Sequence, residues 1–527
     1  MRRRALLGSG LTALAAPLAG CDQAAPLQGG WVGTSPARGH RLRSGALPRA
    51  AVQRRAQVLV VGGGIAGLAA ARAYSRAGID DVQLLELEDQ PGGNSRGHVL
   101  AGQPCPLGAH YLPLPGPHAH VVSEWLHEIG LLRQHLGRTV ADERHLCHSP
   151  QERLWIDGAW AGGLLPPAEP GSATLAQVRR FAQRVSDAQR IGFAMPTLQA
   201  PWTAEHALLD SQTFAAWLDA AGLDDPRLRW YLDHCCRDDY GAPAAVVSAW
   251  AGLHYFASRH GFHAPGDDAD GDDGEPVFTW PEGNAWLVQR LAAPLAGRLH
   301  GGRTVLRVEE TRHAVQVLAW DDTRQQAEAW TAQQVVLALP LFVAARVLQN
   351  PPEALRQAAA ALPHAPWLVA NLQLSAPLLD RPGAPPSWDS VVYGSTALGY
   401  VDAGHQRLDP RPTAPVLTAY EALPVAQRGA LLADDWRPWA AQVVQHLAGV
   451  HPDLPGKLLR VDLTRHGHAM AVPVPGQRTS AAQGALAALR AQRGRLRFAH
   501  ADLSSYSVFE EAFTLGTQVA GAARREG

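Results

Sequence analysis

Three glycines at a fixed spacing are the residues of this sequence best placed to do chemistry. Gly62, Gly64 and Gly67 lie in the stretch VLVVGGGIAGLAAARAYSRAG, residues 58–78. The apolar run before them predicts a strand, and the alanine-rich run after them predicts a helix. At this spacing the first glycine permits a tight turn, the second lets the backbone approach a pyrophosphate, and the third lets helix and strand pack closely. The pattern therefore predicts a phosphate bound at the start of the helix.

A carboxylate further along the chain limits which nucleotides can bind. Glu86 follows Gly67 by 19 residues, at the end of the predicted strand VQLLELE, residues 82–88. A carboxylate at this place accepts hydrogen bonds from ribose hydroxyls, and it would repel a 2′-phosphate. Ile65 and Ala66, which open the helix, supply N–H groups to the pyrophosphate. The unit is therefore expected to bind an adenine dinucleotide without a 2′-phosphate, and NAD and FAD fit equally well.

The elements that position these residues occur in three separated pieces. Strand and helix patterns of the same kind return in the middle of the chain, where QQVVLALP runs into Pro340, and at the C-terminus, where LRFAHAD precedes a helix. We therefore expect an α/β fold, with a Rossmann-like, doubly wound parallel sheet interleaved with an α+β substrate domain. The expected nucleotide-binding pieces are 56–115, 280–350 and 486–527, and the substrate domain comprises 116–279 and 351–485.

The first residues resemble a bacterial export signal. Arg2, Arg3 and Arg4 precede the short apolar run ALLGSGLTALAAPLAG, which is too short to span a membrane. The run ends in LAGC, which resembles a lipobox whose Cys21 is lipidated, and RRALL resembles a twin-arginine signal. The alternative is an ordinary cysteine near a cleavage site. We expect residues 1–21 to direct export and anchoring to the periplasmic face of the inner membrane, and residues 22–55 to form a linker.

Composition excludes several other classes. The formal net charge of −1 gives no overall basic field for nucleic acid. Cysteines do not occur at CxxC spacing, so we expect buried thiols and no metal site. The acidic stretch at residues 266–275 lacks the glycine and glutamate positions of an EF-hand and is interpreted as a solvated loop. Lys457 is the only lysine.

A second glycine motif distinguishes between the two dinucleotides. The stretch EDQPGGNSRG, residues 88–97, resembles the second glycine motif of the flavin amine oxidase superfamily, which includes monoamine and polyamine oxidases, protoporphyrinogen oxidase and phytoene desaturases. The resemblance implies that Gly92 and Gly93, with Asn94 and Arg96, continue the diphosphate cradle. In that family the arginine directly follows the glycine pair, whereas here it comes two residues later. The resemblance implies FAD as the cofactor.

Further segments extend the resemblance through the flavin-binding parts. PLGAHYL is similar to the segment that passes the flavin ring, TVLRV to a strand that meets the adenine, VVLALP to a strand that ends near the ring, and FAHADLSSYSVFEEAFTLG to the C-terminal flavin motif, in which an acidic residue binds the ribityl chain. The cofactor-binding residues that the resemblance implies here are Gly108, Ala109, His110, Tyr111, Val305, Pro340, Asp502 and Phe509.

In this family a hydride passes from a substrate carbon to the flavin, and an amine substrate must be neutral when it reacts. Many amine oxidases of the family have a lysine near the flavin. The equivalent strand here, PWLVANLQL at residues 366–374, contains no lysine. Aromatic residues and histidines are candidates for the substrate pocket, with core packing as the alternative: Trp250, His254, Tyr255, His466 and His468.

Three functions follow as hypotheses. The first is oxidation of an amine or polyamine. The second is desaturation or oxidation of a lipophilic, non-amine substrate, which the missing lysine and the membrane anchor favour. The third is a flavin-binding protein without catalysis.

Overall fold

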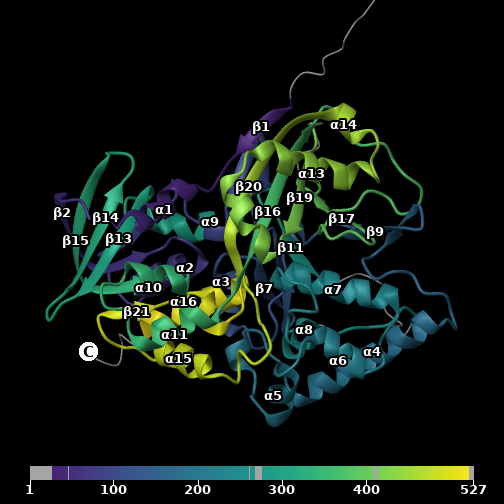
Figure 1. Ribbon diagram of the computed structural model, residues 1–527, viewed down its shortest axis with the longest axis horizontal. Coiled ribbons are helices and arrows are strands. Elements are labelled where there is room, and N and C mark those ends of the chain that lie inside the picture. Colours follow the sequence, from purple (N-terminus) through teal and green to yellow (C-terminus); the bar gives the residue numbers. More distant parts are fainter. Residues whose placement is uncertain are drawn as a thin grey trace, which may run out of the picture.

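The computed structural model describes residues 27–45, 47–259, 261–266, 276–407, 409 and 414–521. Two parts lie side by side, each built on its own sheet (Figure 1). Cys21 and most of the acidic stretch 266–275 fall outside the described residues. Within the described part of the chain, no helix is both long and apolar enough to cross a membrane.

The first sheet is the expected nucleotide-binding sheet. Its spatial order is β12 (Leu299–His300), β3 (Val82–Leu85), β2 (Ala50–Val61), β15 (Gln326–Leu337), β14 (Val315–Asp321) and β13 (Arg303–Glu310), with β21 (Leu496–Phe498) paired to β15. The pairs of β12, β3, β2, β15 and β21 are parallel, whereas β13, β14 and β15 are antiparallel. The predicted α/β fold with a parallel sheet is therefore confirmed, and an antiparallel extension is added to it.

Strand β2 is buried on both faces at its end because its apolar residues run without a break. Val58 and Val60 face one core, and Leu59 and Val61 face another, as the two-residue period of a strand requires. On the first face lie α2 (Ile65–Arg76), α3 (His120–Glu128), α9 (Ala285–Ala292) and α16 (Phe509–Gly521). On the second lie α10 (Leu341–Val347), α11 (Glu353–Ala361) and α15 (Ala481–Arg490).

One predicted domain boundary lies too early in the chain. The substrate domain was expected to begin at residue 116, but α3 packs in the core of the first part. The indole of Trp125 in α3 stacks on the ring of Phe513 in α16, with ring centroids 4.9 Å apart. The reason is the amphipathic pattern of α3, whose buried side chains Val122, Trp125 and Leu126 lie on one face.

The second sheet has eight strands. In spatial order they are β1 (Gln28–Trp31), β20 (Leu458–Ala471), β16 (His364–Leu374), β19 (Val416–Ala422), β18 (Tyr400–Asp402), β17 (Asp389–Val392), β9 (Glu152–Ile156) and β10 (Ala159–Gly162). One face packs on α4 (Ala173–Ile191), α5 (Ala204–Asp210), α6 (Phe214–Ala220), α7 (Pro226–Tyr240) and α8 (Ala249–Ala257). The other packs on α12 (Arg428–Ala433), α13 (Trp436–Ala448) and α14 (Leu454–Lys457).

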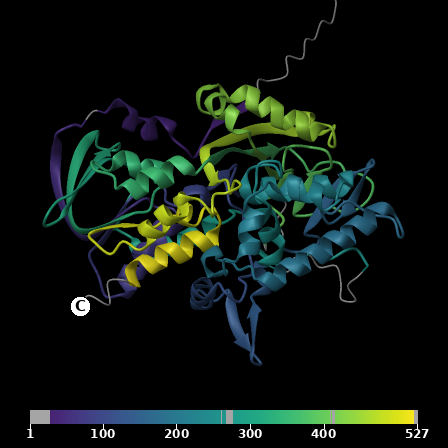
Figure 2. The same cartoon turned by 60° about the horizontal axis from the view of Figure 1, so that its bottom comes forward.

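Three two-stranded sheets complete the fold. They are β4 (Gly97–Leu100) with β5 (Gln103–Pro106), β6 (Tyr111–Pro113) with β11 (Val277–Thr279), and β7 (Leu132–His135) with β8 (Arg138–Ala141). The β7–β8 hairpin projects from the body at the bottom of Figure 2.

The expected linker at residues 22–55 is structured from residue 27 onward. β1 joins the second sheet, α1 (Pro36–Ser44) lies against the first part, and β2 already begins at Ala50. The glycines, prolines and arginines of this segment suggested a tether. Its order instead comes from partners distant in sequence, because β1 pairs in parallel with residues 460–463 of β20.

Candidate functional site

The first glycine turn has the geometry that the spacing predicted. Gly62 has φ +105°, and a side chain there would meet the carbonyl oxygen of Ala338. A Cβ at Gly67 would overlap the carbonyl oxygen of Gly62, so helix α2 can approach the turn only with glycine at this position. Ile65 and Ala66 are buried at the start of α2. The turn therefore presents backbone, and no side chains, at the N-terminus of the helix.

The second glycine motif folds back onto the first. The N–H of Gly92 donates to the carbonyl of Gly63 at 2.7 Å. Gly93 has φ +56°, and a Cβ there would lie 3.3 Å from the Cα of Gly64. A Cβ on Gly64 would meet nothing closer than the Cα of Gly93 at 4.0 Å. The two motifs thus form a backbone cradle beside a helix N-terminus, which suits the diphosphate of FAD.

Glu86 lies at the end of β3, beside this cradle. Its Oε2 accepts from the N–H of Gly63 at 2.6 Å, and its Oε1 accepts from the N–H of Glu88 at 2.9 Å. Burial raises the pKa of Glu86, and these two N–H donors oppose the rise. The backbone bonds fix the carboxylate where it could accept hydrogen bonds from ribose hydroxyls, so the position fits the predicted adenosine contact.

The side chains of Arg96 and Asn94 donate hydrogen bonds to backbone carbonyls of the protein. The Arg96 guanidinium donates to the carbonyls of Gly93, at 3.0 Å, and of Gly33. The side-chain amide of Asn94 donates to the carbonyl of Ala469 at 2.6 Å. Arg96 is buried and therefore supports the second glycine motif from behind.

The segment from residue 107 to residue 111 connects the cradle to the second part. The carbonyl of Asn94 accepts from the N–H of Ala109 at 2.8 Å, and His466 contacts the carbonyl of Leu107 at 2.8 Å. Gly108 is half-buried and Ala109 is exposed, although Cys105, Pro106 and Leu107 before them are buried. An exposed stretch of backbone between two buried ones suits the predicted contact with the flavin ring.

Asp502 is completely buried where the C-terminal segment meets α10. Its Oδ2 accepts from the N–H of Leu341, the residue after Pro340, at 2.9 Å, and it lies 3.2 Å from the Nε2 of His364. Burial alone would raise the pKa of Asp502, but the imidazoles of His500 and His364 hold it below its ordinary value. Asp502 therefore caps α10, and its contact with a ribityl hydroxyl stays a prediction.

Two other predicted residues present backbone only. Val305 is buried in β13 at a bulge. Phe509 opens α16, but its ring stacks on Trp125 at 5.9 Å and faces the core. Any contact of these two residues with FAD would be made through the main chain.

A cavity adjoins the segment 107–111 and separates the helices of the second part from its sheet. Its volume is about 100 Å³. The lining comes from the ring-contacting segment, β9, α7, α8 and the sheet, and includes His110, Tyr111, Glu152, Tyr231, Asp238, Tyr255, Arg259, Trp388, Asp389 and Tyr420. Side chains from at least six separate stretches of sequence thus converge on one space.

Three carboxylates give the cavity its electrostatic character. Burial raises the pKa of Asp238 to about 7, with Asp239 adding to the rise. Burial also raises the pKa of Asp389 well above its usual range, with Glu152 and Asp238 contributing. Carboxylates that raise one another's pKa lie close together and favour a cation between them.

Aromatic rings form the wall next to the carboxylates. The imidazole of His110 stacks on Tyr420, with centroids 4.4 Å apart and planes at 26°. Tyr111 meets Trp388 edge to face at 6.1 Å, and its hydroxyl donates to Asp238 at 3.2 Å. Burial lowers the pKa of His110 to about 3, so this imidazole is neutral and does not repel a cation.

Of the predicted pocket residues, only Tyr255 lines this cavity. Trp250 and His254 face the helical core instead, where Trp250 lies 5.7 Å from the ring of Phe193. His254 contacts the carbonyl of Ala194 at 2.9 Å. His466 and His468 point toward the first part: His468 packs on Phe342 at 4.6 Å.

The cavity residues that the sequence did not predict include Glu152, Tyr231, Asp238, Arg259, Trp388, Asp389 and Tyr420. They carry no shared motif, and the one available signal was the acidic and aromatic cluster around Asp238.

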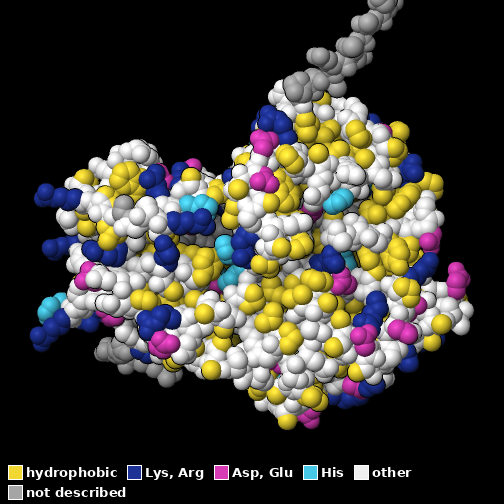
Figure 3. Space-filling model, viewed as in Figure 1, with side chains coloured by type: hydrophobic (Ala, Val, Ile, Leu, Met, Phe, Trp, Pro, Cys, Tyr) yellow, Lys and Arg dark blue, Asp and Glu magenta, His cyan; other side chains and the backbone are white. Residues whose placement is uncertain are grey.

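The single lysine lies away from the cavity. Lys457 ends α14 and pairs with Asp453 at 2.8 Å. Strand β16, which was expected to pass near the flavin, contains no lysine. Its residues Trp367 and Val369 face the helical core. The face of the molecule in Figure 3 shows arginine side chains gathered over the end that carries β2 and β13–β15, with acidic side chains scattered.

Known proteins share this architecture. Residues 65–523 match the family described as flavin containing amine oxidoreductase. The chain is 27% identical over 287 residues to a Mycobacterium tuberculosis protein that carries the name flavin-containing monoamine oxidase AofH. It is 27% identical over 309 residues to polyamine oxidase 4 of Oryza sativa subsp. japonica. These alignments cover 56% and 54% of the relatives, so the chain spans about half the length of the curated relatives it matches.

Solved structures share the fold over nearly the whole chain. Putrescine oxidase bound to putrescine matches 90% of this chain and 100% of its own, with a TM-score of 0.64 and 17% identity. Cyclohexylamine oxidase from Brevibacterium oxydans gives the same coverage, TM-score and identity. The chain belongs to the flavin-containing amine oxidoreductase family.

Proposed function

We propose that this protein is an FAD-dependent oxidoreductase that oxidises a cationic amine, and that a substrate with two amino groups suits it best. The observation that carries the proposal is the cavity in which Glu152, Asp238 and Asp389 face aromatic rings. A protonated amino group can pair with these carboxylates, whereas a lipophilic substrate offers them no charge.

Each group in the cavity has a distinct task. The carboxylates attract a protonated amino group, and the rings of Tyr420 and Trp388 can contact a second one through their faces. Neutral His110 leaves the ring-contacting segment uncharged, which favours loss of a proton from the amino group that reacts. FAD, when bound, supplies the acceptor for the hydride that leaves the substrate carbon.

The names of similar proteins agree with oxidation of an amine, but the proposal is based on the cavity. Putrescine oxidase and polyamine oxidase 4 are named for di- and polyamines. A conjugated-linoleic-acid-producing fatty acid isomerase from P. acnes shares the fold too, with a TM-score of 0.61. The fold therefore hosts both substrate classes, and the carboxylates of this cavity favour the amine.

The test is anaerobic reduction of the flavin in the purified, FAD-loaded protein. We expect putrescine to bleach the flavin band faster than butylamine at equal concentration, because only putrescine offers two cations. Bleaching by long-chain apolar compounds alone would replace the proposal with a lipophilic substrate. A flavin that dithionite reduces but no amine or apolar compound does would leave a flavin-binding protein without catalysis.

We further propose that the protein is exported and anchored in the inner membrane through lipidated Cys21. Cys21 is six residues before Leu27, where the described chain begins. Six residues reach at most about 21 Å, so an anchored protein would lie close to the bilayer with the β1 end toward it. Mass spectrometry of the N-terminal peptide from membrane-extracted protein tests this. Acyl chains on Cys21 are expected, and an unmodified Cys21 would refute the anchor.

A further inference from the structure

The segment at residues 27–44 lies outside the family match, which begins at residue 65. It crosses from one part of the molecule to the other. Its β1 pairs with β20 at the edge of the second sheet, the N–H of Val32 donates to the carbonyl of Leu463 at 2.8 Å, and the hydroxyl of Thr34 donates to the carbonyl of Arg465 at 2.9 Å. From Ser35 onward the segment contacts the first part.

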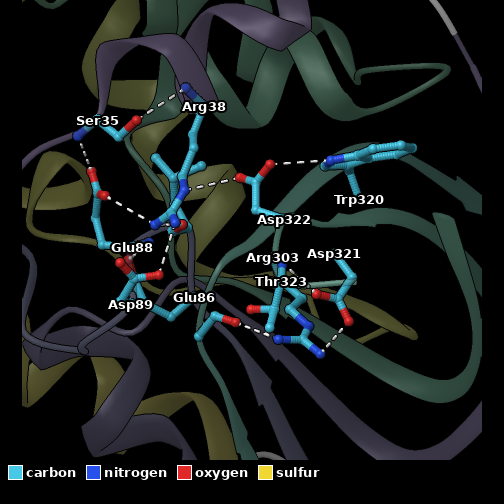
Figure 4. Close-up of polar contacts among 12 residues, drawn as sticks. Ser35, Arg38, Glu86, Glu88, Asp89, Arg303, Trp320, Asp321, Asp322 and Thr323 are labelled. Carbon is cyan, nitrogen blue, oxygen red and sulfur yellow. Dashed lines mark hydrogen bonds and ion pairs between the residues drawn. The ribbon is translucent and has the colours of Figure 1, made fainter. Parts of the chain in front are cut away.

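On the first part, the segment contacts the turn that follows Glu86 (Figure 4). The N–H of Ser35 donates to the Oε1 of Glu88 at 2.8 Å. The guanidinium of Arg38 pairs with the Oδ1 of Asp89 at 2.8 Å and with the Oδ2 of Asp322 at 2.9 Å. One side chain thus joins the turn after β3 to the turn after β14.

These two turns hold the predicted ribose carboxylate. The N–H of Glu88 donates to the side chain of Glu86, and the N–H of Arg303 donates to its carbonyl at 2.8 Å. The N–H of Gly302 donates to the carbonyl of Glu88 at 2.8 Å, and the N–H of Asp322 donates to the carbonyl of Gly302 at 3.0 Å.

The segment reaches the diphosphate side of the cradle as well. The carbonyl of Gly33 accepts from the guanidinium of Arg96, which also donates to the carbonyl of Gly93 in the second glycine motif. Within six residues, from Gly33 to Arg38, the segment therefore supports both ends of the adenosine diphosphate site.

Arg38 is the central residue of this segment because its positive charge lies between two carboxylates. The side chains of Glu88 and Asp322 are only 11% and 10% exposed, and Arg38 lies within ion-pair distance of both. Without Arg38, Glu88 would lose this cation and Asp322 would keep only Arg41, at 2.8 Å. The two poorly solvated carboxylates would then be less well neutralised, and like charges repel. The turns would then separate at the point where they support the ribose contact.

We propose that residues 27–44 form a strap that retains FAD, and that Arg38 is its positioning residue. The strap fixes the turn after β3 and Arg96 against the second sheet, so that FAD leaves only when the strap is displaced. Hydrogen bonds to charged groups of this kind change an equilibrium by roughly 10- to 100-fold. We expect Arg38→Ala to raise the rate of FAD release by at least about tenfold.

The experiment uses the full chain loaded with FAD and follows free flavin fluorescence after dilution. Arg38→Lys keeps the charge and loses the planar fork, so its release rate should lie between wild type and Arg38→Ala. Arg43→Ala is the matched control, because Arg43 lies on the same helix and forms no ion pair with a described residue. It should release FAD at the wild-type rate.

Thermal unfolding separates retention from general stability. If Arg38 acts on FAD, Arg38→Ala lowers the unfolding temperature of the holoprotein more than that of the apoprotein, so the increase that FAD gives is smaller in the variant. Unchanged release in Arg38→Ala, equal acceleration in Arg43→Ala, or an apoprotein destabilised as much as the holoprotein would each overturn the proposal.

Discussion

Replacing Asp238 by asparagine should strengthen the fold while weakening the binding of a diamine. Asp238 lies in the last turn of α7, next to Asp239, and its side chain lines the cavity. Its carboxylate accepts from the Tyr111 hydroxyl at 3.2 Å. Its pKa is raised from 3.8 to about 7, chiefly by burial. An ionised Asp238 is thus held at a cost, and asparagine keeps the shape of the side chain without the charge.

The magnitude follows from the pKa. Each unit corresponds to about 1.4 kcal/mol, so a rise from 3.8 to about 7 corresponds to at most about 4 kcal/mol. Water in the cavity lessens this cost, and we expect Asp238→Asn to gain about 2 kcal/mol at pH 8. The sign depends on pH: a carboxyl with a raised pKa contributes stability below its unfolded pKa, and that contribution is lost as the pH rises through 7. Near pH 4 the gain should therefore vanish.

Binding should change in the opposite direction. A carboxylate that holds an ammonium group contributes about 1.5–3 kcal/mol, so the variant should need roughly 10- to 100-fold more putrescine for half-maximal flavin reduction. Butylamine, with a single amino group, should be affected much less.

Two assays decide the matter. Urea unfolding at pH 8 and pH 4, followed by tryptophan fluorescence, measures stability, and anaerobic flavin reduction measures the amine response. Asp80→Asn, at an exposed carboxylate outside the cavity, serves as the control and should change neither. A variant that is less stable than wild type at pH 8 would refute the assignment of Asp238 as a buried cation-binding carboxylate. An equal rise in the half-saturating concentrations of putrescine and butylamine would refute it too.

Three other outcomes are expected. In the wild-type protein, kcat/KM for putrescine should fall as the pH drops below about 7, more steeply than for butylamine, because Asp238 takes up a proton; parallel pH profiles would contradict this. Gly93→Val should weaken FAD binding at least about tenfold in titrations of the apoprotein, because φ is +56° and the new side chain would point at Gly64; unchanged affinity would place the diphosphate elsewhere. Lys457→Ala should leave the rate of flavin reduction within about twofold, since Lys457 pairs with Asp453 away from the cavity; a large loss would implicate the lysine after all.

The nucleotide-binding half of the fold could be read from the sequence because its signals are local. Gly62, Gly67 and Glu86 lie within one strand–helix–strand unit, and the steric reason for each glycine is present in the spacing itself.

The cavity could be predicted only in part, because its residues meet through tertiary structure. On α8 one face was expected to line a pocket, but successive helical residues point about 100° apart. His254 therefore faces the core while Tyr255 faces the cavity. Asp389 lies at the start of a short strand with no signal of its own.

The strap was missed for a related reason. Residues 27–44 show no apolar periodicity, and α1 buries none of its residues. Its position depends on Arg38 and on carboxylates 50 or more residues away, Glu88 and Asp322. Composition alone therefore suggested a linker.

The most direct test of amine oxidation in this cavity is stopped-flow reduction of the flavin by putrescine, without oxygen, in the wild-type protein and in Asp238→Asn. Fast bleaching of wild type, with a large rise in the half-saturating putrescine concentration for the variant, is the result we predict. A wild-type flavin that dithionite reduces and putrescine, butylamine and other amines leave oxidised would contradict it.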